Sequence, residues 1–241
     1  MSLTWLAMKT TWIRTFPSHL VCILNISQCS LMVTLTASGD LRHVIQSFNG
    51  LPSDYSGHLN ILVNDFNPII FCRDIVLLLI LGNVPDEIVA ADMALHFWYS
   101  ISMPQEYHFR LVVIVTSFVQ QLHAMTFPMS LGPRSTLLTF FRTEFLTTYF
   151  NHFISSSLST REIQDEYTRV RTEPSRQDYR DRMYASLKPS HRVAFHQYRR
   201  SGIVLPFGAK NDHFTRPNHS LFSLEGKWLQ TDYADPLEGW E

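Results

Sequence analysis

The chain has 241 residues, of which 45% are hydrophobic and 17% are charged, and its formal net charge is −1. This composition excludes a wholly disordered, collagenous or disulfide-stapled protein. The low net charge excludes strong non-specific attraction of the whole molecule to nucleic acid or to an anionic membrane. Residues 1–160 hold 7 Lys/Arg and 9 Asp/Glu, whereas the shorter remainder holds 13 and 12. The sequence therefore predicts an apolar body followed by a charged C-terminal layer.

The cysteines and the apolar runs indicate in which cellular compartment the protein is expected. Cys22, Cys29 and Cys72 are an odd, small set, which argues against a disulfide framework and is typical of a reducing compartment. Their spacing matches no structural zinc site, so no metal site is predicted. The apolar runs over residues 75–81 and 109–119 are shorter than the roughly 20 residues that cross a bilayer. We expect a cytoplasmic location and no association with membranes.

The first predicted elements lie between residues 31 and 81. A β-rich run over 31–36 precedes apolar residues at helical spacing over 41–48, and residues 59–63 form a second apolar strand. A helix is expected to begin at Pro68, with Asn67 as its N-cap. Apolar strands that alternate with helices favour a parallel α/β sheet. Residues 1–30 form an N-terminal segment of uncertain structure, and residues 31–241 are predicted to form one domain.

Helical patterns dominate the chain beyond residue 84. A strand is expected over residues 136–141, and residues 203–241, rich in Pro, Gly and aromatic residues, are expected to wrap around the body. The charged C-terminal layer, helical and extended, begins at about residue 160. The predicted helices cover 85–100, 104–125, 144–153, 159–171 after a Ser159-x-x-Glu162 capping box, a segment from Pro174, and 189–201 with Gly202 as its stop.

A candidate ligand site follows the first predicted strand. Ser38, Gly39 and Asp40 lie between a strand and a helix, where doubly wound folds bind phosphate or nucleotide groups through helix N-terminal amides. Asp65 ends the next strand, where an acidic residue accepts ribose hydroxyls. These four residues are the predicted cofactor-binding residues. The competing interpretation is a tight turn at Gly39 and a helix cap at Asp65 or Asn67, since a Rossmann fingerprint requires more glycines.

Two further features of the sequence each have a simpler, structural interpretation. His96 is interpreted as a hydrogen-bonded core histidine rather than a catalyst. Residues 161–200 carry 10 basic and 6 acidic side chains among tyrosines. Such a segment is able to contact RNA or an acidic partner, but the interspersed acids favour a solvated helical face with i,i+4 pairs. The sequence contains no nucleophile elbow, Walker A loop, HExxH motif or EF-hand loop, so no catalytic residue is predicted.

A series of short motifs occurs in a fixed order, over residues 37–45, 50–57, 62–65, 75–81, 95–100, 176–182, 205–208 and 234–240. Together they resemble a fungal family of domains of unknown function that is associated with MYND-type zinc-finger proteins. That family is related to the N-terminal domain of the dynein axonemal assembly factor 3 family. The resemblance covers about residues 31–241.

The resemblance implies an α/β fold with a Rossmann-like, methyltransferase-like three-layer sheet, onto which the charged C-terminal layer packs. It carries over no established activity, and no zinc finger lies in this sequence. We therefore expect a non-catalytic module for protein interaction or assembly, with an unknown protein partner, no cofactor and no nucleic-acid partner. The alternative is an S-adenosylmethionine-dependent methyltransferase, or a degenerate S-adenosylmethionine binder, that uses the Gly39 turn and Asp65.

Overall fold

In the computed structural model, the backbone contacts divide the chain into two units. Unit 1 consists of Met1–Ile75 and Met125–Leu146, and unit 2 consists of Val76–Ala124 and Thr147–Glu241. The two units are described separately below. The residues that the structure describes are 20–25, 30–36, 41–124, 128–131, 135–139, 143–155, 158–172, 174, 177–206 and 208–229.

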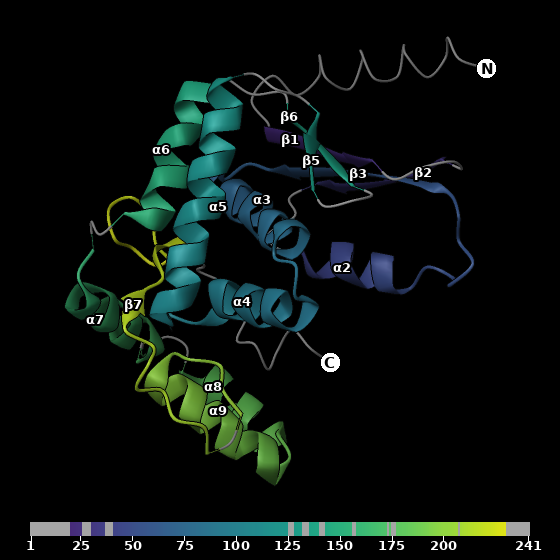
Figure 1. Ribbon diagram of the computed structural model, residues 1–241. Coiled ribbons are helices and arrows are strands. Elements are labelled where there is room, and N and C mark those ends of the chain that lie inside the picture. Colours follow the sequence, from purple (N-terminus) through teal and green to yellow (C-terminus); the bar gives the residue numbers. More distant parts are fainter. Residues whose placement is uncertain are drawn as a thin grey trace. The chain divides into compact units, whose positions relative to one another are not determined.

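Unit 1 contains a five-stranded sheet with the strand order β2-β3-β1-β6-β5. Among its described strands, only β2 and β3 pair in parallel, with Val33 opposite Ile61, and the other three pairings are antiparallel. Helix α2, Arg42–Asn49, connects β2 to β3 (Figure 1). The strands are β1 Leu20–Asn25, β2 Ser30–Thr36, β3 His58–Asp65, β5 Met129–Ser130 and β6 Thr136–Thr139.

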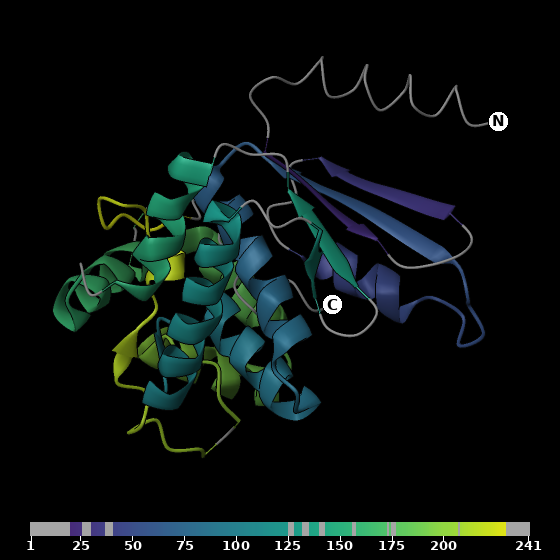
Figure 2. The same cartoon turned by 45° about the horizontal axis from the view of Figure 1, so that its top comes forward.

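Buried and half-buried residues alternate along the strand β3. Leu59, Ile61 and Val63 are buried, and the residues between them are half-buried. This period of two is typical of a strand that packs one face against the core. Helix α2 lies along one face of the sheet in both views (Figures 1 and 2) and buries Val44.

Unit 2 is built mainly from helices. Its strands β4, Ser102–Met103, and β7, Arg216–Pro217, form a separate antiparallel pair, and a short 3₁₀ helix, η2, covers His219–Leu221. No described helix combines the length and the apolar composition that crossing a bilayer requires. The helices are the second half of α3 Pro68–Asn83, α4 Glu87–Tyr99, α5 Gln105–His123, most of α6 Thr143–Ile154, α7 Thr160–Arg171, α8 Gln177–Ser186 and α9 Pro189–Ser201.

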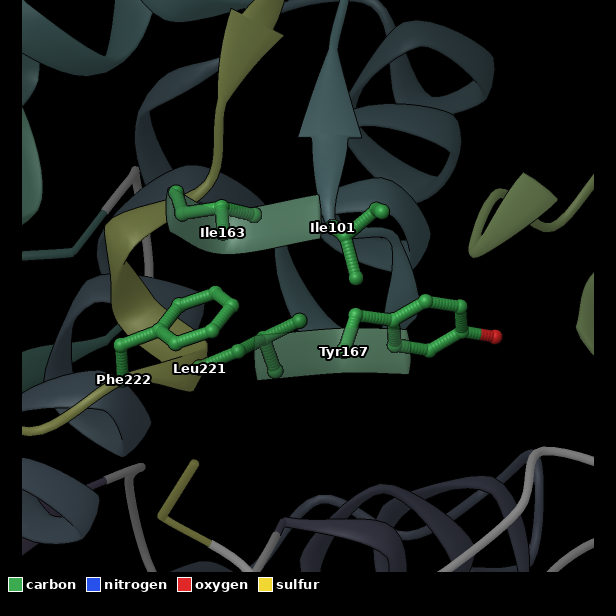
Figure 3. Packing of buried hydrophobic residues seen from close by; sticks show 5 residues of the cluster. All are labelled: Ile101, Ile163, Tyr167, Leu221 and Phe222. Carbon is green, nitrogen blue, oxygen red and sulfur yellow. The ribbon is translucent and has the colours of Figure 1, made fainter. Parts of the chain in front are cut away.

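The C-terminal segment of unit 2 contributes to the hydrophobic core of that unit. A cluster joins Ile101, two residues after the end of α4, to the buried face of α7 and the end of η2 (Figure 3). The ring of Trp228 packs edge-on against Phe222, with 5.3 Å between the ring centroids. Since these side chains come from distant parts of the sequence, their burial ties residues 219–229 to the helices. The cluster consists of Ile101, Ile163, Tyr167, Leu221 and Phe222, each 5% exposed or less.

The predicted three-layer, Rossmann-like α/β fold is wrong. Helices occupy much more of the described chain than strands do, and the sheet is mixed, with a single parallel pair among its described strands. A doubly wound sheet returns to a parallel strand after each helix. Here the chain forms α3, α4 and α5 in succession after β3, without adding a strand to the sheet. No strand was predicted before residue 31, yet β1 pairs antiparallel with both β3 and β6.

Predictions for individual elements are confirmed more often than the prediction for their arrangement. The elements β2, α2, β3 and α3 lie within a few residues of their predicted bounds. The helix predicted from Pro85 is α4, and Asp86 caps it by accepting hydrogen bonds from the backbone N of Ile88 and Val89 at 2.9 and 3.1 Å. Local signals thus located the helix ends, while pairing between distant strands depended on contacts that no local pattern encodes.

Candidate functional site

The structure describes one of the four predicted cofactor-binding residues. Ser38, Gly39 and Asp40 lie outside the described residues. Asp65 is buried at the C-terminal end of β3, and its Oδ1 accepts a hydrogen bond from the backbone N of Asn67 at 2.8 Å. Asn67 in turn caps α3 by accepting from backbone N–H groups of its first turn, as the competing interpretation expected. Cofactor binding by the four residues stays a prediction.

His96 is a buried, hydrogen-bonded histidine, as predicted. Its Nδ1 lies 2.9 Å from Oγ of Ser100, and its Nε2 lies 3.6 Å from Oδ1 of Asp92. Burial lowers the pKa of His96, while the Asp92 carboxylate raises it and His213 lowers it further. Asp92, His96 and Ser100 follow one another at four-residue spacing, yet Ser100 is fully buried. This series therefore presents no nucleophile to solvent.

A buried amide closes the C-terminal end of α4. Nδ2 of Asn218 lies 3.2, 2.8 and 2.8 Å from the carbonyl oxygens of His96, Phe97 and Ser100, to which it donates. Its Oδ1 accepts from the backbone N of Ser220 at 3.1 Å. These side chains are neutral, and helix C-terminal carbonyls need such partners when they are buried. We call Asn218, Ser100 and Ser220 the α4 cap.

The helices α7, α8 and α9 surround a pocket of about 530 Å³, which we call the arginine pocket. This volume lies in the range of small-ligand sites, about 300–1,000 Å³. Among the residues that the structure describes, four arginines and one aspartate line the pocket, and they come from all three helices. Its charged or titratable residues are Arg171, Arg180, Asp181, His196, Arg199 and Arg200.

Local sequence signals fix the ends of the helices at this pocket. Helix α7 begins with the predicted capping box, in which Ser159 Oγ accepts from the backbone N of Glu162 and the Glu162 carboxylate accepts from the backbone N of Ser159. Helix α9 begins at Pro189 and stops at Gly202, whose φ of +71° is left-handed. A Cβ at that position would lie 2.6 Å from the side chain of Ile101, so glycine is required there.

Arginine side chains connect the C-terminal ends of α7 and α9. Nη1 of Arg171 donates to the carbonyl oxygen of Arg199 and, at 3.2 Å, to that of Arg200. Nη2 of Arg199 and Nη1 of Arg180 donate to the carbonyl oxygen of Arg171 at 2.5 and 2.9 Å. Helix C-terminal ends carry partial negative charge, so cations are favourable there. These contacts hold the guanidinium groups of Arg171, Arg180 and Arg199 in place.

Aromatic rings form the apolar part of the pocket lining. The rings of Tyr184 and Phe195 lie 6.0 Å apart between centroids, and Phe195 is buried. The guanidinium carbon of Arg192 lies 5.5 Å from the Tyr184 ring centroid, and that of Arg199 lies 5.4 Å from the Phe195 centroid. An apolar wall beside the arginines lowers the local dielectric constant and so strengthens their attraction to an anion.

Sequence reasoning identified the basic segment but not the pocket within it. The expected solvated face is present at Arg161 and Asp165, an exposed i,i+4 pair 3.7 Å apart. The lining arginines come from three helices, however, and no single spacing in the sequence relates them. Among the described residues, no group of three or more His, Cys, Asp or Glu side chains is placed to hold a metal ion. The chemistry that this lining offers is the binding of anions by charge and N–H donors.

Comparison with known proteins gives one match. Residues 12–103 match a family model described as "Domain of unknown function (DUF4470)". This range includes β1, β3 and α4, and it ends before the helices of the arginine pocket. No curated protein and no solved structure matches the chain. The predicted resemblance to a domain of unknown function is thus confirmed over residues 31–103, and the match also includes residues 12–30, where no resemblance was predicted. The fungal, MYND-type and dynein-assembly associations stay predictions.

Proposed function

We propose that this chain is a non-catalytic interaction module that binds an acidic segment of a partner protein at the arginine pocket. The observation that carries the proposal is the lining, in which the described residues include four arginines and one aspartate. Guanidinium groups bind carboxylates through two parallel N–H···O bonds, a geometry that an ammonium group does not reproduce. Because the net charge of the chain is −1, the whole molecule does not attract anions strongly, and the attraction has to come from a local cluster of basic side chains.

The resemblance to the dynein axonemal assembly factor 3 family and to MYND-associated fungal domains supports a protein as the partner. We place the interaction in the cytoplasm, since the three cysteines suit a reducing compartment. The alternative role in S-adenosylmethionine binding rested on the three-layer fold, which the structure lacks, and on residues of which only Asp65 is described. No observation favours that alternative.

Fluorescence anisotropy of a labelled Glu-Gly repeat peptide, titrated with the full chain, tests the proposal. Arg200→Gln removes one charge from the lining and keeps the backbone carbonyl that Arg171 contacts. We expect it to weaken binding about tenfold, which corresponds to about 1.4 kcal/mol. Arg161→Gln is the matched control, because it makes the same charge change at an exposed residue outside the lining.

The control variant is expected to bind within about twofold of the unmodified chain, since exposed charges contribute little beyond about 10 Å at physiological salt. Equal losses in the two variants would mean that only net charge matters, which contradicts a site in the pocket. Equally tight binding of a Gln-Gly repeat peptide would contradict the acidic partner itself.

A further inference from the structure

We infer that the arginine pocket takes a phosphate monoester, carried by a phosphorylated side chain of the acidic partner segment. This inference rests on the proposed function and names the chemical group that occupies the pocket. Three properties of the lining carry it: its charge, the directions from which its donors come, and its size.

The described lining residues carry more positive than negative charge. Among them are four arginines and one acidic residue, Asp181. A carboxylate brings a single negative charge and two acceptor oxygens, whereas a phosphate monoester brings about −1.5 to −2 and three strong acceptor oxygens. The more highly charged group therefore matches this lining better.

The donors come from three helices rather than from one. Arg171 ends α7, Arg180 lies in α8, and Arg199 and Arg200 lie in the last turn of α9. Carbonyl contacts already hold three of these side chains, so little conformational entropy remains to be lost when an anion binds. Donors from several directions suit a tetrahedral group, because its three oxygens point to different sides, while a carboxylate is planar.

The size and the aromatic wall of the pocket also favour a whole modified side chain. A pocket of about 530 Å³ has room for more than a carboxylate group. Tyr184 and Phe195 supply apolar surface beside the arginines, on which the carbon atoms of a phosphorylated residue can pack. Asp181 is the acidic residue among the described lining residues, and its charge repels any anion in the pocket.

The test compares three labelled Glu-Gly peptides that carry Ser, Glu or phosphoserine at one central position, each titrated with the full chain. We expect the phosphoserine peptide to bind at least about tenfold more tightly than the Glu peptide. Arg200→Gln is expected to reduce this advantage to about threefold or less, and Arg161→Gln to preserve it. Inorganic phosphate at millimolar concentration is expected to compete with the phosphoserine peptide.

Asp181→Asn supplies a second variant that alters none of the arginine contacts described above. It removes the opposing charge and is expected to tighten binding of the phosphoserine peptide about threefold, so the inference is tested even if an arginine variant unfolds. Circular dichroism checks the folding of every variant.

The outcomes separate the inference from the proposed function. If the Glu and phosphoserine peptides bind equally and both lose affinity in Arg200→Gln, the phosphate inference is overturned and the proposed function stands. If neither peptide binds, both are overturned. Tighter binding of a single-stranded RNA than of the phosphoserine peptide at the same salt concentration would also overturn the inference, because the pocket would then recognise phosphodiesters.

Discussion

Two sites in unit 2 bind helix C-terminal carbonyls with opposite chemistry. At the α4 cap, the neutral amide of Asn218 is buried with its oxygen and its nitrogen both hydrogen-bonded. At the arginine pocket, charged guanidinium groups contact the carbonyls of α7 and α9 beside a cavity of about 530 Å³. The α4 cap is a closed hydrogen-bond network, whereas the arginine pocket borders a space that is large enough for a ligand.

This difference separates a structural role from a binding role. In a buried neutral network, the donors and acceptors are already hydrogen-bonded to one another, so none is left to bind a ligand. Loss of such a network lowers the stability of the fold. A charged lining around a cavity contributes little to stability but attracts ions of opposite charge. We therefore expect substitutions at the α4 cap to change the free energy of unfolding, and substitutions at the arginine pocket to change affinity.

The largest effect on stability is expected for Asn218→Ala. The substitution leaves the buried carbonyls at the end of α4 without their amide donor, which costs about 3 kcal/mol of unfolding free energy. Urea denaturation measures the change, and Asn211→Ala, at an exposed position, is the matched control. A loss in Asn218→Ala no larger than in the control would contradict the structural role of the α4 cap.

A pH dependence is expected from two buried histidines near the C-terminal segment. His152 Nε2 lies 3.0 Å from the carbonyl oxygen of Phe222, and His219 Nε2 lies 3.3 Å from that of Leu158. Burial lowers the pKa of both; at His219 the neighbouring His152 lowers it further, whereas at His152 hydrogen bonds and Glu225 partly oppose the shift. The neutral forms are therefore favoured in the folded state.

The unfolded-state pKa of histidine is about 6.5, so this stabilisation is complete above pH 6.5 and is lost as the pH falls through the lower folded-state values. Urea denaturation between pH 8 and pH 5 should show the decline, and His152→Gln should make it shallower. A free energy of unfolding that rises as the pH falls below 6.5 would be inconsistent with buried neutral histidines.

A second acid-sensitive group lies at Glu166. The hydrogen bonds from Arg169 lower the pKa of Glu166 to about 2, with a further contribution from the backbone N of Trp228. Because this pKa is depressed, the stabilisation is present above the unfolded value of about 4.3 and is lost as the pH falls toward 2. Trp fluorescence should report a transition in this range, and Glu166→Gln should abolish that component.

A smaller effect is expected at the capping box of α7. Ser159→Ala removes the hydroxyl that accepts from the backbone N of Glu162, at a cost of about 1 kcal/mol. Ser159→Asp restores a capping acceptor and should recover most of the loss in a thermal melt. Equal melting temperatures for the Ala variant and the unmodified chain would show that tertiary packing alone fixes the start of α7.

The smallest change in stability is expected for Arg200→Gln, within about 0.5 kcal/mol. Its side chain belongs to the pocket lining, while its carbonyl, which Arg171 contacts, stays in place. A large destabilisation in urea, comparable to that of Asn218→Ala, would remove the distinction between the two sites.

The sequence predicted local structure well and distant contacts poorly. Some signals act within a single helix, such as the pair Ser159 and Glu162 or the pair Pro189 and Gly202. Such signals can be recognised from the sequence alone. Asn218 caps a helix that ends more than a hundred residues earlier, and no spacing relates the two. The same holds for the arginine pocket, whose lining comes from three helices, and for β1, whose partners β3 and β6 lie far along the chain.

Hydrogen exchange of the full chain with and without the phosphoserine peptide tests the central claim most directly. Binding at the arginine pocket predicts slower exchange in the residues around Arg171, Arg180 and Arg200, with unchanged exchange around Asn218 in the α4 cap. Slower exchange confined to the α4 cap, or to residues outside α7, α8 and α9, would contradict the claim.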